Sequence, residues 1–170
     1  MKIINKLSKY SNYFSTFRHC IKVVDKHIPG KDTQGVGTLV LMDKTISETH
    51  KRSGGMYFLE RDNMPARIEL YLEQLINSIP EFVPKLGIFV NYSIVRMLLH
   101  EIGHHVNQKY AYEKDEAGWE ESAGEYALKY LWKIYGFWMY VFLTLGSLDM
   151  RNLKNRERYY NSTSQHKGAV

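Results

Sequence analysis

The sequence predicts an α+β fold in a single domain, with a short mixed or antiparallel sheet followed by two helices. A length of 170 residues suits one domain, and a hydrophobic share of 44% is enough to bury a sizeable core. Short β-rich stretches occur before residue 73, and helical apolar stripes follow residue 90. We find no repeat or linker that would divide the chain.

The first segment, residues 3–28, predicts an N-terminal helix. Its apolar side chains recur at spacings of three and four, as on one face of a helix. Ile28-Pro29-Gly30 should end it, because proline does not continue a helix and glycine tolerates the turn.

Three short stretches then predict the strands of the sheet. Residues 38–42 and 56–59 are β-rich, and residues 67–72 begin with the polar-apolar alternation of a half-buried strand. A helix starting in the third stretch is the competing interpretation. The polar residues 44–55 should form a loop, whose Gly54-Gly55 lacks the lysine of a phosphate-binding loop.

Two helices follow the sheet. Asn91 is a good N-cap for the first, whose apolar stripe continues to Val106. Residues 107–113 should be a connecting loop. The second helix should start near Asp115 or Glu116, since acidic residues suit the positive end of the helix dipole. Its stripe of apolar residues is most simply core packing.

The C-terminal part contains an uncharged run, residues 134–148. As a helix it would span about 22 Å, less than the roughly 30 Å of a bilayer core. We therefore interpret residues 132–148 as a buried or partner-facing apolar helix, with membrane association as the alternative, because tryptophan and tyrosine suit a lipid interface. The single domain then covers residues 1–150, with its core at about 32–131 and a polar basic tail at 151–170.

The net charge of +5 is unevenly spread. Residues 1–31 carry +6 and residues 149–170 carry +3, whereas the middle of the chain carries −4. We interpret the basic ends as solvated termini and expect no nucleic-acid partner. With one cysteine, Cys20, and no visible secretory signal, we expect a cytoplasmic protein, the alternative being a membrane-associated one.

The helix at residues 94–106 carries the motif His-Glu-x-x-His. Residues four apart lie one above the other on a helix, so His100 and His104 can bind one metal ion. Glu101 is rotated by about 100° and suits a general base that takes a proton from water beside the metal. One cysteine excludes a four-cysteine site, so the expected ligands are histidine and carboxylate.

The third ligand should come from the second helix, which offers four acids: Glu116, Glu120, Glu121 and Glu125. Glu120 is favoured, because Ala123 and Gly124 lie one turn further on and are small enough for a close approach of the two helices. Glu121 and Glu125 look like solvated acids but remain alternatives.

These residues resemble the gluzincin metallopeptidases in their minimal single-domain form, the minigluzincin or lethal-factor-like form. The resemblance rests on His100-Glu101-Ile102-Gly103-His104 and on Glu-Glu-Ser-Ala-Gly-Glu-Tyr-Ala at 120–127. It covers residues 56–131 and is specific at 94–127. The chain departs from the family at Gly124, where an aspartate often supports a ligand histidine. Glu125 or a backbone carbonyl would then take that place.

The resemblance implies a zincin-like fold and a Zn²⁺-dependent endopeptidase acting on a protein or peptide substrate. It implies His100, His104 and Glu120 as zinc ligands and Glu101 as general base. It also implies that an edge strand, either residues 56–59 or 68–72, pairs with the substrate.

Three tyrosines are candidate oxyanion donors: Tyr110, Tyr112 and Tyr126. His105 points about 100° away from His104 and should lie in a supporting or solvent-facing position. The alternative function is a catalytically idle zinc-domain regulatory or interaction protein, antirepressor-like or membrane-associated. It would act through its basic ends and apolar tail. The sequence leaves the oligomeric state and the substrate open.

Overall fold

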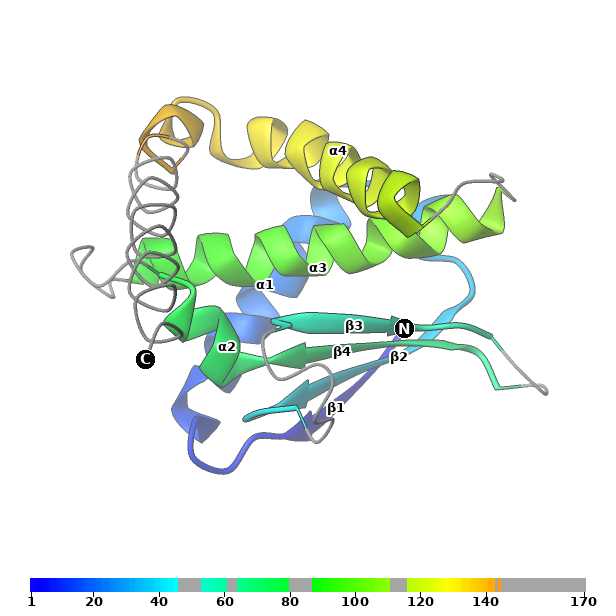
Figure 1. Cartoon of the computed structure of the whole chain (residues 1–170). Helices are drawn as coiled ribbons and strands as arrows, with labels where there is room; N and C mark the ends of the chain where they lie inside the picture. The colour runs from blue at the N-terminus through cyan, green and yellow to red at the C-terminus, as the bar shows by residue number, and fades with distance from the viewer. Residues whose placement is uncertain (46–52, 61–63, 80–86, 111–115, 143, 145–170) are drawn as a thin grey trace, which may run out of the picture.

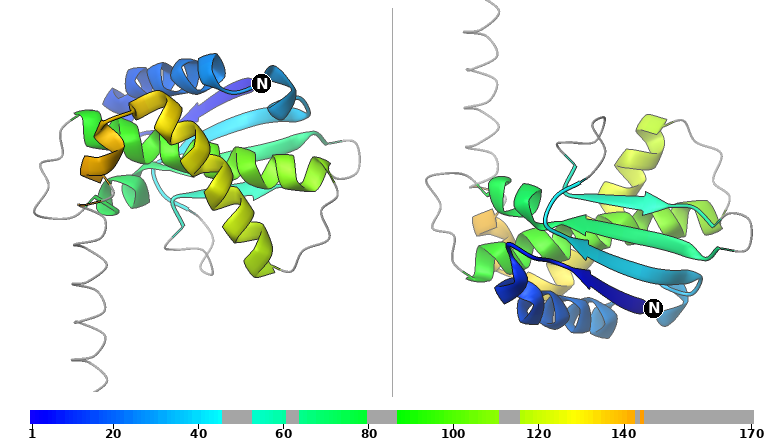
Figure 2. Two further views of the ribbon diagram at one scale, coloured as in Figure 1. Left: turned by 90° about the horizontal axis from the view of Figure 1, so that it is seen from above. Right: turned by 90° about the horizontal axis from the view of Figure 1, so that it is seen from below.

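The computed structural model describes residues 1–45, 53–60, 64–79, 87–110, 116–142 and 144. They form an α+β fold with a mixed four-stranded sheet in the order β1-β2-β4-β3. Helix α3 (Gly87–Lys109) lies on one face of this sheet next to α1 (Phe14–His27), and α4 (Glu116–Tyr135) packs over α3 (Figure 1). No described helix covers the opposite face, seen from below in Figure 2.

The three strands expected from the sequence are confirmed. They are β2 (Val36–Met42), β3 (Gly55–Phe58) and β4 (Ala66–Tyr71). Strand β4 runs parallel to β2 and antiparallel to β3, which is the edge strand on the side of α3. A short helix, α2 (Leu72–Asn77), follows β4 directly.

The prediction of one helix over residues 3–28 is wrong in its first half. Residues Lys2–Lys6 form the edge strand β1, parallel to β2, and a 3-10 turn (Ser11–Tyr13) precedes α1. The carboxylate of Asp43 accepts hydrogen bonds from the backbone N–H groups of Ser8, Lys9 and Tyr10 and so holds the turn between strand and helix. The helical spacing is misleading here because β2, which pairs with β1, lies more than 30 residues away.

Helix α3 is longer than expected at both ends. It begins at Gly87, so Asn91 lies inside the helix and is not its N-cap. It also continues to Lys109, into the stretch 107–113 that we expected to be a loop. Val90 and Asn107 are buried near the two ends, and this packing extends the helix beyond the stripe visible in the sequence. The expected start of α4 near residue 116 is confirmed.

The apolar run after Lys133 is not one helix. Helix α4 continues through Lys133 and ends at Tyr135, and Gly136 then adopts a φ of 50°, which favours glycine. Met139 and Phe142 return to the core, where the ring of Phe142 stacks on Tyr92 at 4.0 Å. The rest of 132–148 after residue 144, and the tail 151–170, lie outside the described residues. Among the helices that are described, none combines the length and apolarity needed to cross a bilayer.

The main core lies between the sheet and the helices. Alternate residues of β2 and β4, such as Leu39, Leu41 and Ile68, face α1 and α3 and are fully buried. Cys20 of α1 is buried in the same core. This packing fixes α3 against β3 and leaves a cleft between α3, α4 and β3.

Candidate metal centre

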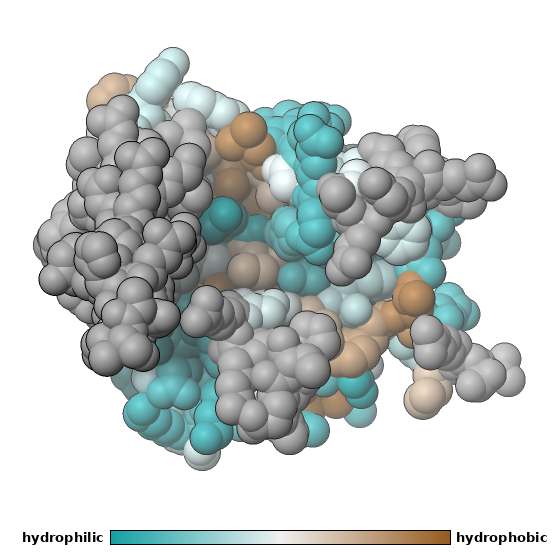
Figure 3. All heavy atoms as spheres, viewed as in Figure 1, coloured by the Kyte–Doolittle hydropathy of each residue, from teal (hydrophilic) through white to brown (hydrophobic). Residues whose placement is uncertain are grey.

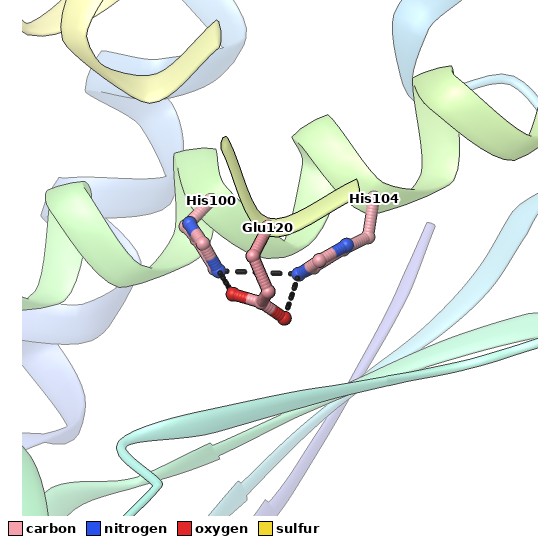
Figure 4. A group of neighbouring side chains, drawn as sticks. All are labelled: His100, His104 and Glu120. Atoms are coloured by element: carbon pink, nitrogen blue, oxygen red, sulfur yellow. Dashed lines mark hydrogen bonds and ion pairs between the residues drawn. The ribbon is translucent and has the colours of Figure 1, made fainter. Parts of the chain in front are cut away.

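Helix α3 brings the two motif histidines together on the side that faces the cleft. His100 and His104 lie one turn apart, and their Nε2 atoms are 3.1 Å from each other (Figure 4). Their rings are perpendicular, with centroids 4.7 Å apart. The side chains therefore point to one shared position, as the spacing predicts.

Glu120 reaches the same position from α4. Its Oε2 lies 3.2 Å from Nε2 of His100, and its Oε1 lies 3.2 Å from Nε2 of His104 (Figure 4). Its side chain is 60% exposed, so the carboxylate stands at the mouth of the cleft. Of the other acids whose side chains are described on α4, Glu121 and Glu125 are exposed, and neither belongs to this cluster.

The two imidazoles and the carboxylate of Glu120 lie close to the spacing of zinc ligands. Donors bound at about 2.0–2.1 Å to a tetrahedral ion lie about 3.3 Å from one another. The two Nε2 atoms are 3.1 Å apart, and each lies 3.2 Å from a different carboxylate oxygen of Glu120, so the carboxylate spans the two histidines at close to this value. The chemistry and spacing of these three residues therefore fit a zinc ion.

The surroundings of the two histidines favour the neutral form that a metal needs. Burial lowers the pKa of both His100 and His104. The positive charge of Arg96 lowers the pKa of His100 further, and the charge of His100 lowers the pKa of His104 further. The negative charge of Glu120 opposes this effect but does not outweigh it. The neutral imidazole is therefore favoured at both positions, and only a neutral imidazole can donate its lone pair to a metal.

The close approach of α3 and α4 depends on Gly103 and Ala123. A Cβ atom added to Gly103 would lie 2.8 Å from Cα of Ala123 and 3.0 Å from its carbonyl oxygen. A Cβ added to Gly124 would meet nothing within 4 Å. The expectation that small residues bring the helices together is right for Ala123 and wrong for Gly124, which lines the open cleft.

Glu101 is buried between α3 and β3 and is only 4% exposed. A Cβ at Gly55 would lie 2.9 Å from its Oε1, so glycine allows the strand to lie directly against the carboxyl group. The backbone N–H of Tyr57 donates a hydrogen bond to this carboxylate. Burial, together with the charge of Glu120, nevertheless raises the pKa of Glu101 to about 8.

The cleft has a volume of about 690 Å³ and opens on the face shown in Figure 3. It holds both histidines, Glu101 and Glu120. Its other walls are mostly apolar: Met56 and Leu59, Met97 of α3, and Ala127, Leu128 and Leu131 of α4. Tyr92 and Arg96 line its end toward the start of α3. Arg96 was not among the site residues that the sequence predicted, although its position four residues before His100 places it on the same face of the helix.

His105 differs from its neighbour, and its burial excludes the solvent-facing position that was one of the two we expected. It is 6% exposed and turned toward the sheet, with its Nδ1 3.0 Å from the hydroxyl of Tyr57 and its Nε2 3.0 Å from the carbonyl oxygen of Gln34. Its ring also packs at the Gly35 turn, where φ is 103°. His105 thus joins α3 to β3 and to the loop before β2.

Of the three tyrosines considered as oxyanion donors, Tyr110 and Tyr126 are described and do not line the cleft. The hydroxyl of Tyr126 donates a 2.8 Å hydrogen bond to Oδ2 of buried Asp32. Tyr110 directly follows the last residue of α3 and is exposed. Tyr112 lies outside the described residues. The contact between Tyr126 and Asp32 instead ties α4 to the 3-10 turn η2 (Gly30–Asp32).

Comparison of the chain with protein-family models, curated proteins and solved structures gave no match.

Proposed function

We propose that this protein is a zinc-dependent metallopeptidase with a zincin-like, gluzincin-type site. One observation carries the proposal. Two imidazole nitrogens and one carboxylate lie at the spacing of zinc ligands, in a cleft that also contains a buried carboxyl group. The peptide bonds of a protein substrate are the reactants that this set of groups suits.

In this proposal His100, His104 and Glu120 hold the ion. When bound, zinc supplies Lewis acidity, which acidifies a water molecule and polarises the scissile carbonyl. Glu101 takes the proton from the attacking water on a carboxylate oxygen and passes it to the leaving amine. The dication favours ionised Glu101 and so counters the burial that raises its pKa.

Strand β3 is the proposed docking edge for the substrate. The backbone of Gly54 pairs with Tyr71 of β4, so in the antiparallel alternation Gly55 and Tyr57 direct their backbone groups outward. The N–H of Tyr57 already binds Glu101, and the carbonyl of Gly55 accepts from the hydroxyl of Ser53. An extended substrate can therefore form main-chain hydrogen bonds with only part of this edge. Side-chain contacts in the cleft must supply the rest of the binding free energy.

The test is cleavage of a proteome-derived peptide library by the zinc-loaded protein and by its Glu101→Gln variant. The variant should keep its zinc and lose cleavage by at least about 100-fold, the usual contribution of a general base. Glu125→Gln is the matched control on α4, and it should cleave like the wild type. Equal cleavage by Glu101→Gln, or no cleavage by the zinc-loaded wild type, would contradict the proposal.

An interaction protein with an idle zinc domain is the second candidate. It is favoured by a group of exposed aromatic side chains in the last turns of α4 and just after this helix: Trp132, Phe137, Trp138 and Tyr140. Exposed apolar groups of this size often mark contact with a partner or a lipid surface. The two candidates differ at Glu101, because an idle domain would keep its biological effect in Glu101→Gln.

A further inference from the structure

One face of α3 lines the cleft with four residues at a spacing of four: Tyr92, Arg96, His100 and His104. Residues at this spacing lie above one another along a helix. Arg96 is thus one turn, or about 6 Å along the axis, from the first metal-binding histidine. That distance is about two residues of an extended peptide.

Arg96 is exposed and has no acidic partner in the described part of the chain. It is also the one lysine or arginine among the described residues that line the cleft. The other charged groups there are Glu101 and Glu120, and their two negative charges would balance a zinc dication. A loaded cleft would therefore keep the uncompensated positive charge of Arg96.

We propose that Arg96 binds a carboxylate of the peptide substrate, within about two residues of the scissile bond and toward the start of α3. This inference rests on the proposed peptidase function and adds a substrate preference to it. A guanidinium group binds a carboxylate through two parallel hydrogen bonds, which gives direction as well as charge. The apolar walls formed by Met56, Met97 and Leu128 suit apolar side chains next to the acidic group.

The carboxylate has two sources, an Asp or Glu side chain or the free C-terminus of the substrate. The probe is a positional library of hexapeptides in which each position carries Asp or Asn in turn. One copy of the library has amidated C-termini and the other has free C-termini. Cleavage is measured with the zinc-loaded wild type, and binding is measured with zinc-loaded Glu101→Gln by affinity selection and mass spectrometry.

The expected result is a preference of about 10- to 100-fold for the acidic peptides at one position, as loss of a charge-assisted hydrogen bond implies. Arg96→Gln should reduce this preference to near unity while keeping its zinc. Arg18→Gln, which changes an exposed arginine of α1 away from the cleft, should keep the preference. A preference seen only in the library with free C-termini would assign the carboxylate to the substrate terminus.

The inference is overturned if the wild type shows no acidic preference, or if the preference persists in Arg96→Gln. Cleavage whose preference is the same in the wild type and in Arg96→Gln would leave the peptidase proposal intact and contradict only the role of Arg96. Binding of acidic peptides through Arg96 without cleavage by the wild type would support the carboxylate site and contradict the peptidase. Absence of both binding and cleavage would contradict both.

Discussion

His104 and His105 are neighbours in the sequence and lie on different sides of α3. The ring of His104 faces the cleft, where its Nε2 meets His100 and Glu120. The ring of His105 faces the sheet, where Tyr57 and the backbone of Gln34 contact both of its nitrogens. The comparison teaches that a histidine becomes a candidate ligand when its free nitrogen points to other donors, whereas one with both nitrogens engaged stabilises the fold.

The largest expected effect separates these two histidines. His104→Ala should weaken zinc binding by more than about 100-fold, because loss of a mere supporting partner already weakens metal binding by 10- to 100-fold. His105→Ala should lower the free energy of unfolding of the metal-free protein by about 1–3 kcal/mol, since it leaves buried polar groups without a partner. Zinc titration and urea unfolding measure the two effects. Equal loss of zinc affinity in both variants would contradict the distinction.

The next effect tests how the two helices meet. Gly103→Ala places a methyl group against the backbone of Ala123, so it should cost about 1–3 kcal/mol of stability and weaken zinc binding by moving Glu120. Gly124→Ala is the matched change on the open side. It has free space and should stabilise α4 by up to about 1 kcal/mol. Zinc titration and urea unfolding measure both variants. If Gly103→Ala changes neither the zinc affinity nor the stability, the close approach of α3 and α4 is contradicted.

A third effect concerns pH and Glu101 in the metal-free protein. Its carboxyl group has a pKa of about 8 when folded, against a reference value of 4.5. The folded state therefore keeps a proton that the unfolded state loses between these values. The resulting stability is complete below about pH 4.5 and is lost as the pH rises through about 8. Glu101→Gln should thus gain thermal stability relative to the wild type as the pH rises from 5 to 8. If the difference in thermal stability between Glu101→Gln and the wild type does not change with pH, burial of this carboxyl group is contradicted.

The sequence predicted the parts of the site that depend on local periodicity. A spacing of four on one helix is enough to place His100 beside His104. The small residue Ala123 correctly indicated that α4 approaches α3, and Glu120 does lie beside the histidines. Gly103, the other half of that contact, was not recognised, because its role depends on a residue 20 positions later.

The parts that the sequence did not predict depend on distant partners. His105 contacts residues 48 and 71 positions away, so its spacing from His104 says nothing about its burial. Gly54-Gly55 looked like a plain turn, although both glycines let β3 lie against α3. The strand β1 resembled a helix for the same reason, since only its pairing with β2 distinguishes the two.

The most direct test of a three-residue zinc site is the zinc content of purified, zinc-reconstituted protein, measured by inductively coupled plasma mass spectrometry. The wild type and Glu125→Gln should each hold about one zinc ion per chain, as a site with three protein ligands requires. Glu120→Gln should lose most of that zinc. A wild type without stoichiometric zinc would contradict the account, as would zinc that survives in Glu120→Gln and is lost from Glu125→Gln.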